Sequence, residues 1–141
     1  MNLTPARALA LSALLLTASA CEAESDDAIL IELTKLTPTA MGTCVVDYTI
    51  QNNTKNRLTK FVVSMNWTKP DDDGGGYFDT VISAENLPPK EKKMQKNSIA
   101  LPDGGECAKL PEPWVSRWHD CKLENVPEGD CQDAVVVRAS Y

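Results

Sequence analysis

Residues 44–50 read Cys44-Val45-Val46-Asp47-Tyr48-Thr49-Ile50, and every second side chain, beginning with Cys44, is apolar or aromatic. This period of two is typical of a β-strand that buries one face and exposes the other. A run of asparagine, threonine and lysine follows at residues 52–56, which indicates a turn. We therefore predict a strand here, with Cys44 on its inward face.

The same alternation recurs along most of the chain. A fifth, more polar segment ends at Ile99 and Leu101, and four other segments alternate at 29–33, 61–67, 78–84 and 135–141. Runs rich in proline, glycine and aspartate separate them at residues 70–76, 88–89 and 102–105. Six or seven short strands with such turns predict an all-β protein built as an antiparallel β-sandwich.

The C-terminal third departs from this pattern. Pro113 suits the first position of a helix, and Trp114, Trp118 and Cys121 then follow at the i, i+4 and i+7 spacing of one helical face. We therefore predict a short helical cap, tied by a disulfide, whose tryptophans lie against the sandwich.

The N-terminus is typical of a secretory signal peptide. Arg7 precedes an apolar run at residues 8–16, which is too short to span a bilayer, and small residues around Ala18-x-Ala20 form a cleavage site. We predict that residues 1–20 are removed on export, that 21–27 form an acidic tether, and that 28–141 form one domain.

Five cysteines remain after this cleavage, and cysteines of small exported domains are usually joined in disulfides. None lie in a Cys-x-x-Cys motif, which argues against a redox or zinc site. With Cys21 set apart, three pairings remain open. Because Cys44 points inward, it is expected to bond to the C-terminal third, so we favour two disulfides: Cys44–Cys107 and Cys121–Cys131.

Residues 16–21 resemble a bacterial lipobox, in which the final cysteine receives a lipid anchor. The resemblance implies that Cys21 is acylated and holds the protein at a membrane, with the outer membrane as the expected site. Ala18 stands where that motif prefers leucine. Ordinary cleavage before Cys21, which would release a free periplasmic protein, therefore stays open.

Four short motifs resemble the immunoglobulin-like modules of bacterial exported proteins, including the FxLYD-type domains. They are Tyr48-x-Ile50-x-Asn52-Asn53-Thr54, Phe61-x-Val63, Asp73-Gly74 and Leu87-Pro88-Pro89-Lys90-Glu91, with Pro89-Lys90 where Pro-Gly is expected. The chain is also similar to small alphaproteobacterial envelope proteins with a cysteine-rich C-terminal third. The resemblance implies an immunoglobulin-like sandwich and specifies no function.

Charge and motif content narrow the function. Removing residues 1–20 takes away Arg7, so the net charge of −6 becomes −7, which argues against nucleic acid as a partner. His119 is the only histidine, and Asp71-Asp72-Asp73-Gly74 has Lys69 and Thr80 where a calcium loop needs ligands. We expect no catalytic residue, no metal site and no cofactor.

Two groups of residues are candidate contact surfaces. One is aromatic and consists of Tyr77, Phe78, Trp114 and Trp118. The other is basic and consists of Lys90, Lys92 and Lys93, which the alternation places on an edge strand. Lysines on an edge commonly block aggregation, and the alternative is a docking strip for an acidic protein or anionic envelope polymer.

These observations favour a non-catalytic module of the cell envelope that binds another protein. The alternative is a periplasmic inhibitor of a secreted enzyme such as a lysozyme or protease, which small size, disulfides and acidity also suit. A third hypothesis, an enzyme that uses His119 or the acidic loop, has no motif in its favour.

Overall fold

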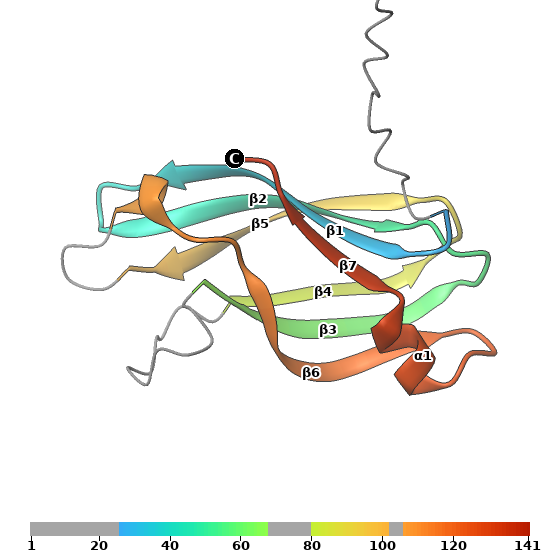
Figure 1. Ribbon diagram of the computed structural model, residues 1–141. Helices are drawn as coiled ribbons and strands as arrows, with labels where there is room; N and C mark the ends of the chain where they lie inside the picture. The colour runs from blue at the N-terminus through green and yellow to red at the C-terminus, as the bar shows by residue number, and fades with distance from the viewer. Residues whose placement is uncertain (1–25, 68–79, 102–105) are drawn as a thin grey trace, which may run out of the picture.

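The computed structural model describes residues 26–67, 80–101 and 106–141, and in these ranges the chain forms two β-sheets packed face to face (Figure 1). One sheet has the strand order β5-β2-β1-β7, and the other has the order β4-β3-β6. The predicted β-sandwich of six or seven strands is confirmed, with seven strands in the described residues. The strands are β1 Ile29–Pro38, β2 Thr43–Asn52, β3 Leu58–Asn66, β4 Thr80–Leu87, β5 Lys92–Ala100, β6 Trp114–Leu123 and β7 Val135–Ala139.

One strand pair in the described sheets departs from the antiparallel prediction. Neighbours within both sheets run antiparallel, except that β1 and β7 run parallel. Parallel strands need a crossover, and here β6 of the other sheet and the short helix α1 (Glu128–Asp133) supply it. The last strand of the chain therefore lies beside the first.

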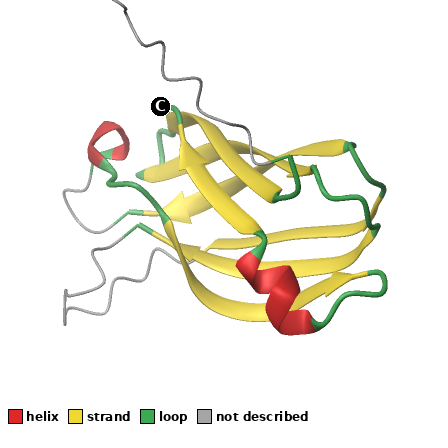
Figure 2. Ribbon diagram, turned by 45° about the vertical axis from the view of Figure 1, so that its right-hand side comes forward, coloured by secondary structure: helices red, strands yellow, loops and turns green. Residues whose placement is uncertain are grey.

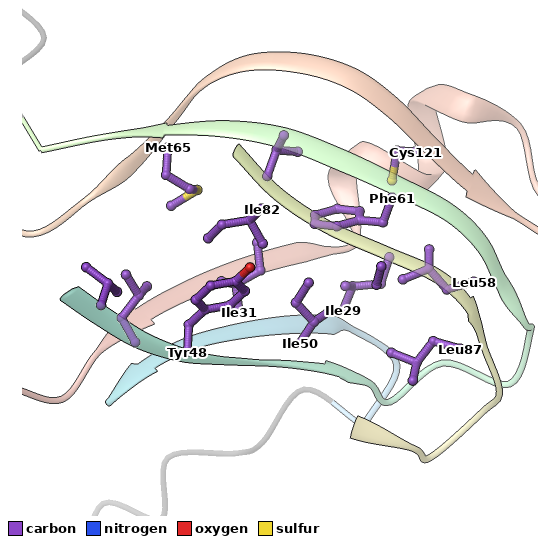
Figure 3. Close-up of a cluster of buried hydrophobic side chains, with 14 of the residues drawn as sticks. Ile29, Ile31, Tyr48, Ile50, Leu58, Phe61, Met65, Ile82, Leu87 and Cys121 are labelled. Carbon is purple, nitrogen blue, oxygen red and sulfur yellow. The ribbon is translucent and has the colours of Figure 1, made fainter. Parts of the chain in front are cut away.

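The alternating residues of the predicted strands form the core (Figure 3). Burial of each large side chain contributes about 1.5–3 kcal/mol, so this layer supplies most of the stabilisation between the sheets. The inward side chains of β2 are at most 2% exposed. The core residues include Ile29, Ile31, Leu33, Cys44, Val46, Tyr48, Ile50, Leu58, Phe61, Val63, Met65, Ile82, Ala84, Ile99 and Cys121.

The predicted helix at Trp114–Cys121 is wrong, because this segment belongs to β6. Two register shifts against β3 each insert one extra residue into β6. The residues that face the core strands, Val115, Trp118 and Cys121, therefore lie three apart, opposite Met65, Val63 and Phe61. This spacing imitates one face of a helix, which explains the error.

A disulfide-tied helical cap does occur, but it lies later in the chain and has only six residues. It is α1, which carries Cys131 and is bonded to β6 through the Cys121–Cys131 disulfide. The second disulfide, Cys44–Cys107, joins β2 to the 3₁₀ turn η1 (Cys107–Lys109). Both are the pairings that the sequence favoured.

Asn52, at the end of β2, has a fully buried side chain that bonds to three other places in the chain. Its Nδ2 donates to the Asn56 carbonyl at 2.8 Å and to the Leu87 carbonyl at 3.0 Å. Its Oδ1 accepts from the Thr54 amide at 3.1 Å and the Thr54 hydroxyl at 2.7 Å. One amide thus joins the β2–β3 turn to the end of β4.

The backbone around Asn52 extends this junction. The Asn52 amide donates to the Glu91 carbonyl at 2.9 Å, the Lys90 amide donates to the Asn52 carbonyl at 2.6 Å, and the Asn53 amide donates to the Ala28 carbonyl at 2.8 Å. The start of β1, the β2–β3 turn and the β4–β5 corner are therefore fixed to one another.

We predict that Asn52→Ala lowers the free energy of unfolding by about 2–4 kcal/mol, because it leaves the buried Leu87 carbonyl without its side-chain donor and removes the acceptor for Thr54. Asn53→Ala, the matched control, removes one bond to Gln51 and costs about 1 kcal/mol or less. Urea unfolding with both disulfides intact measures both values. Equal losses would contradict the central role of Asn52.

Candidate functional site

A groove lies beside the C-terminal half of β7, where the edge of the sheet is open. Its larger part is a cavity of about 500 Å³, with apolar walls from β1, from the segment after η1 and from the C-terminus. The residues that line it are Thr34, Lys35, Leu36, Ala108, Leu110, Glu112, Ala139 and Tyr141.

A second cavity, of about 360 Å³, continues the groove along the outer side of β7 and shares Glu112 and Ala139 with the first. It is lined by Glu32, Glu112, Pro113 and Val137–Ser140. We call the two cavities together the β7 groove. Its rim carries Glu32 and Glu112 as acids and Lys35 and Arg138 as bases.

Tyr141 fixes one end of the β7 groove. Its hydroxyl accepts a hydrogen bond from Trp67 Nε1 at 3.0 Å and donates one to the Pro111 carbonyl at 3.3 Å. Burial raises the pKa of Tyr141, the Glu112 charge adds to this, and the bond from Trp67 opposes it. Because Trp67 is only 1% exposed, the position of Tyr141 is set from the core.

The two described residues of the predicted aromatic contact surface, Trp114 and Trp118, are only partly exposed. Trp118 is half-buried and packs edge-on against Phe61 of the core, with ring centroids 6.4 Å apart. Trp114, at the start of β6, is also half-buried. Tyr77 and Phe78 lie outside the described residues.

The basic cluster divides into two kinds of residue. β5 is the edge of its sheet, as predicted, and Lys92 and Lys93 are exposed on it. Lys90 instead occupies the β4–β5 corner, where its φ of 63° is the left-handed conformation that favours glycine. Its ammonium donates to the carbonyls of Asp26, at 3.0 Å, and Asn53. Lys90 is therefore a structural residue.

His119 lies on the outer face of β6 and has a cross-strand partner. Its Nε2 lies 2.9 Å from the hydroxyl of Ser64, which is only 6% exposed. The neighbouring Asp120 carboxylate binds Lys60 at 2.8 Å and Lys122 at 3.2 Å. These lysines lower the pKa of Asp120, and hydrogen bonding to Asp120 raises that of Lys60. Asp120 therefore does not orient the imidazole, and we interpret the Ser64–His119 bond as structural.

Two other predicted features, Cys21 and the Asp71-Asp72-Asp73-Gly74 loop, also lie outside the described residues. Within residues 26–67, 80–101 and 106–141, no group of three or more histidine, cysteine, aspartate or glutamate side chains is arranged so that it could bind a metal ion. The helices of these ranges include none with the length and apolar character to cross a bilayer. Comparisons with protein-family models, curated proteins and solved structures find no match for this chain.

Sequence reasoning missed the β7 groove. Leu110 and Glu112 lie in an irregular segment without periodicity, and Leu36 follows a register shift in β1 that ends its alternation. Only Glu32 and residues 137–141 belonged to predicted strands. The groove depends on the parallel pairing of β7 with β1, and no local sequence pattern indicates that pairing.

We predict that Lys90→Ala lowers stability by about 1–2 kcal/mol, because it removes two hydrogen bonds and keeps a non-glycine residue in the left-handed conformation. Lys90→Gly loses the same bonds but relieves the backbone, so it should be about 1 kcal/mol more stable than Lys90→Ala. Lys92→Ala is the matched exposed control, with an effect within about 0.5 kcal/mol. Thermal unfolding that ranked Lys90→Ala with Lys92→Ala would contradict this role.

We also predict that Tyr141→Phe lowers the free energy of unfolding by about 1–3 kcal/mol, because the buried Trp67 Nε1–H loses its acceptor. In a double-mutant cycle, Trp67→Phe should cost less in the Tyr141→Phe protein than in the wild type, since the shared bond is already gone. Additive losses in denaturant unfolding would show that the bond contributes nothing.

Proposed function

We propose that the protein is a non-catalytic module of the cell envelope that binds another protein, either held at the outer membrane by lipid on Cys21 or free in the periplasm. The β7 groove is the observation that carries this proposal. Its larger cavity of about 500 Å³ falls within the 300–1,000 Å³ typical of binding sites, and its walls are mainly apolar with charges at the rim.

The direction in which the chain enters the domain supports this proposal. Ile29, the first residue of β1, pairs with Asn52 and Val135, whereas the larger cavity of the groove is lined by residues 34–36, near the other end of that strand. Figure 1 accordingly places the start of β1 and the C-terminus at different ends of the sheet. A lipid on Cys21 would hold the first end at the membrane and leave the groove facing away from it.

The cysteines support an exported location. Four of them form two disulfides, and such bonds persist in oxidising compartments such as the periplasm. The Cys44–Cys107 bond also anchors η1, from which the chain continues directly into the wall of the groove at Ala108 and Leu110. An oxidising location and an intact groove are therefore linked through this one disulfide.

A photo-crosslinking amino acid at Glu112, on the rim of the groove, tests the proposal in cells that make the protein. We expect an adduct with one envelope protein at this position. Matched positions are Lys93, on the exposed basic edge of β5, and Glu85, on the exposed part of β4, where only background crosslinking is expected.

The pattern of adducts separates the competing surfaces. An adduct at Lys93 without one at Glu112 would transfer the binding surface to the basic strip and contradict the role of the groove. The absence of specific adducts at both positions would contradict the proposed binding function. Adduct formation is measured by mass spectrometry of the crosslinked bands.

A further inference from the structure

The C-terminal part of β7, Val137–Ala139, lines the β7 groove, and the outer edge of β7 pairs with no other strand in the described parts of the chain. We infer that this edge accepts an extended segment of a partner polypeptide, which adds to the sheet as a strand next to β7. The inference rests on the proposed protein-binding function and specifies the chemistry of the partner: an extended backbone with apolar side chains at alternate positions.

The direction of the backbone groups follows from two hydrogen bonds. The Ile29 amide donates to the Ala134 carbonyl at 2.9 Å, and the Ser140 amide donates to the Leu33 carbonyl at 2.9 Å. In a parallel ladder, alternate residues turn their backbone groups to opposite sides. Even-numbered residues from 134 to 140 therefore face β1, and Val135, Val137 and Ala139 present their N–H and C=O groups at the open edge.

The edge of β7 lacks the features that normally prevent strand addition. Natural edges are protected by lysines, prolines or bulges. β5, at the opposite edge of the same sheet, carries Lys92, Lys93 and Lys96. β7 reads Val135-Val136-Val137-Arg138-Ala139 and pairs with β1 without a register shift. What protects it is its short length, the charge of Arg138, and the nearby segment at Glu112 and Pro113, which leaves a cavity beside the strand.

The two cavities of the β7 groove flank Ala139, where side chains of an added strand would enter. Side chains alternate between the two faces of a strand, so one set would point into the apolar cavity of Leu36, Leu110 and Tyr141. Binding by strand addition draws affinity from the backbone and specificity from such pockets. A polypeptide is the one class of ligand that matches the outward donors and acceptors of Val135, Val137 and Ala139.

The far wall of the groove favours a single extended chain over a second folded copy. Glu112 and Pro113 line a cavity of about 360 Å³ together with Glu32 and Val137–Ser140. A single extended chain fits into this space because no other part of a folded partner has to enter with it. A second copy that paired edge to edge would bring its own residues 112–113 into the same space.

The test uses a displayed library of random nine-residue peptides, selected against the whole mature protein. Ala139→Pro removes one outward N–H of the edge, and Ala139→Val is the matched control, since it adds similar bulk and keeps the N–H. We expect selected peptides, remade synthetically, to bind the wild type and Ala139→Val with similar affinity, and Ala139→Pro about tenfold more weakly.

Hydrogen exchange of the wild-type protein provides a measurement that needs no substitution. Saturating peptide should slow exchange at the amides of Val135, Val137 and Ala139, and should leave Val136 and Arg138, which already bond to β1, nearly unchanged. Equal loss of affinity in both Ala139 variants, unchanged exchange at the three amides, or a library without binders would overturn the inference. So would a homodimer that Ala139→Pro abolishes, because the occupant would then be a second copy.

The failure of this inference is distinguishable from the failure of the proposed function. If Glu112 crosslinks to an envelope protein that Ala139→Pro and the wild type bind equally well, the binding function stands and strand addition is wrong. If neither Glu112 nor Lys93 gives an adduct, the function itself is contradicted.

Discussion

The buried amide of Asn52 satisfies backbone groups at the point where the chain passes from one sheet to the other, and the arrangement of that whole end depends on it. It holds the β2–β3 turn and the end of β4, while its backbone reaches the β4–β5 corner. Buried carbonyls without donors are costly, so no apolar residue substitutes for it. Lys90 tolerates a conformation suited to glycine because its ammonium bonds to the same junction.

The two sides of the sandwich differ in how they are closed. On one side Asn97 of β5 donates to the Val81 carbonyl of β4, and lysines cover the sheet edge. On the other side α1 and the Cys121–Cys131 disulfide close only the end where β7 begins, as Figure 2 shows for the helix that leads into the strand running to the C-terminus. The rest of that side holds the β7 groove. The β7 groove is therefore open because β7 pairs with β1 instead of pairing with β6.

The fold could be predicted where a local pattern and the final burial agree, as along Cys44 to Ile50. Prediction failed at β6, where two extra residues turned a period of two into the three-residue spacing of Val115, Trp118 and Cys121. The site could not be predicted for a different reason. Its walls come from three separate parts of the chain, within residues 32–36, 108–113 and 137–141, and their proximity depends on long-range pairing that leaves no periodic signal. The role of Lys90 could not be predicted from the sequence either. Its charge indicated an exposed contact surface, whereas its ammonium bonds to the carbonyls of Asp26 and Asn53 and fixes the β4–β5 corner.

The parallel pairing of β1 with β7 also determines when the sheet can be completed. Among the described strands, β1 is synthesised first, and one of its two edges pairs only with β7, which is synthesised last. Contacts between distant parts of a chain form slowly, because the loop must close before the contact contributes free energy. Until β7 is in place, the edge of β1 from Ile29 to Leu33 that pairs with it remains open. A domain of this topology therefore keeps an unpaired strand edge for longer during folding than a sandwich whose first strand is paired locally.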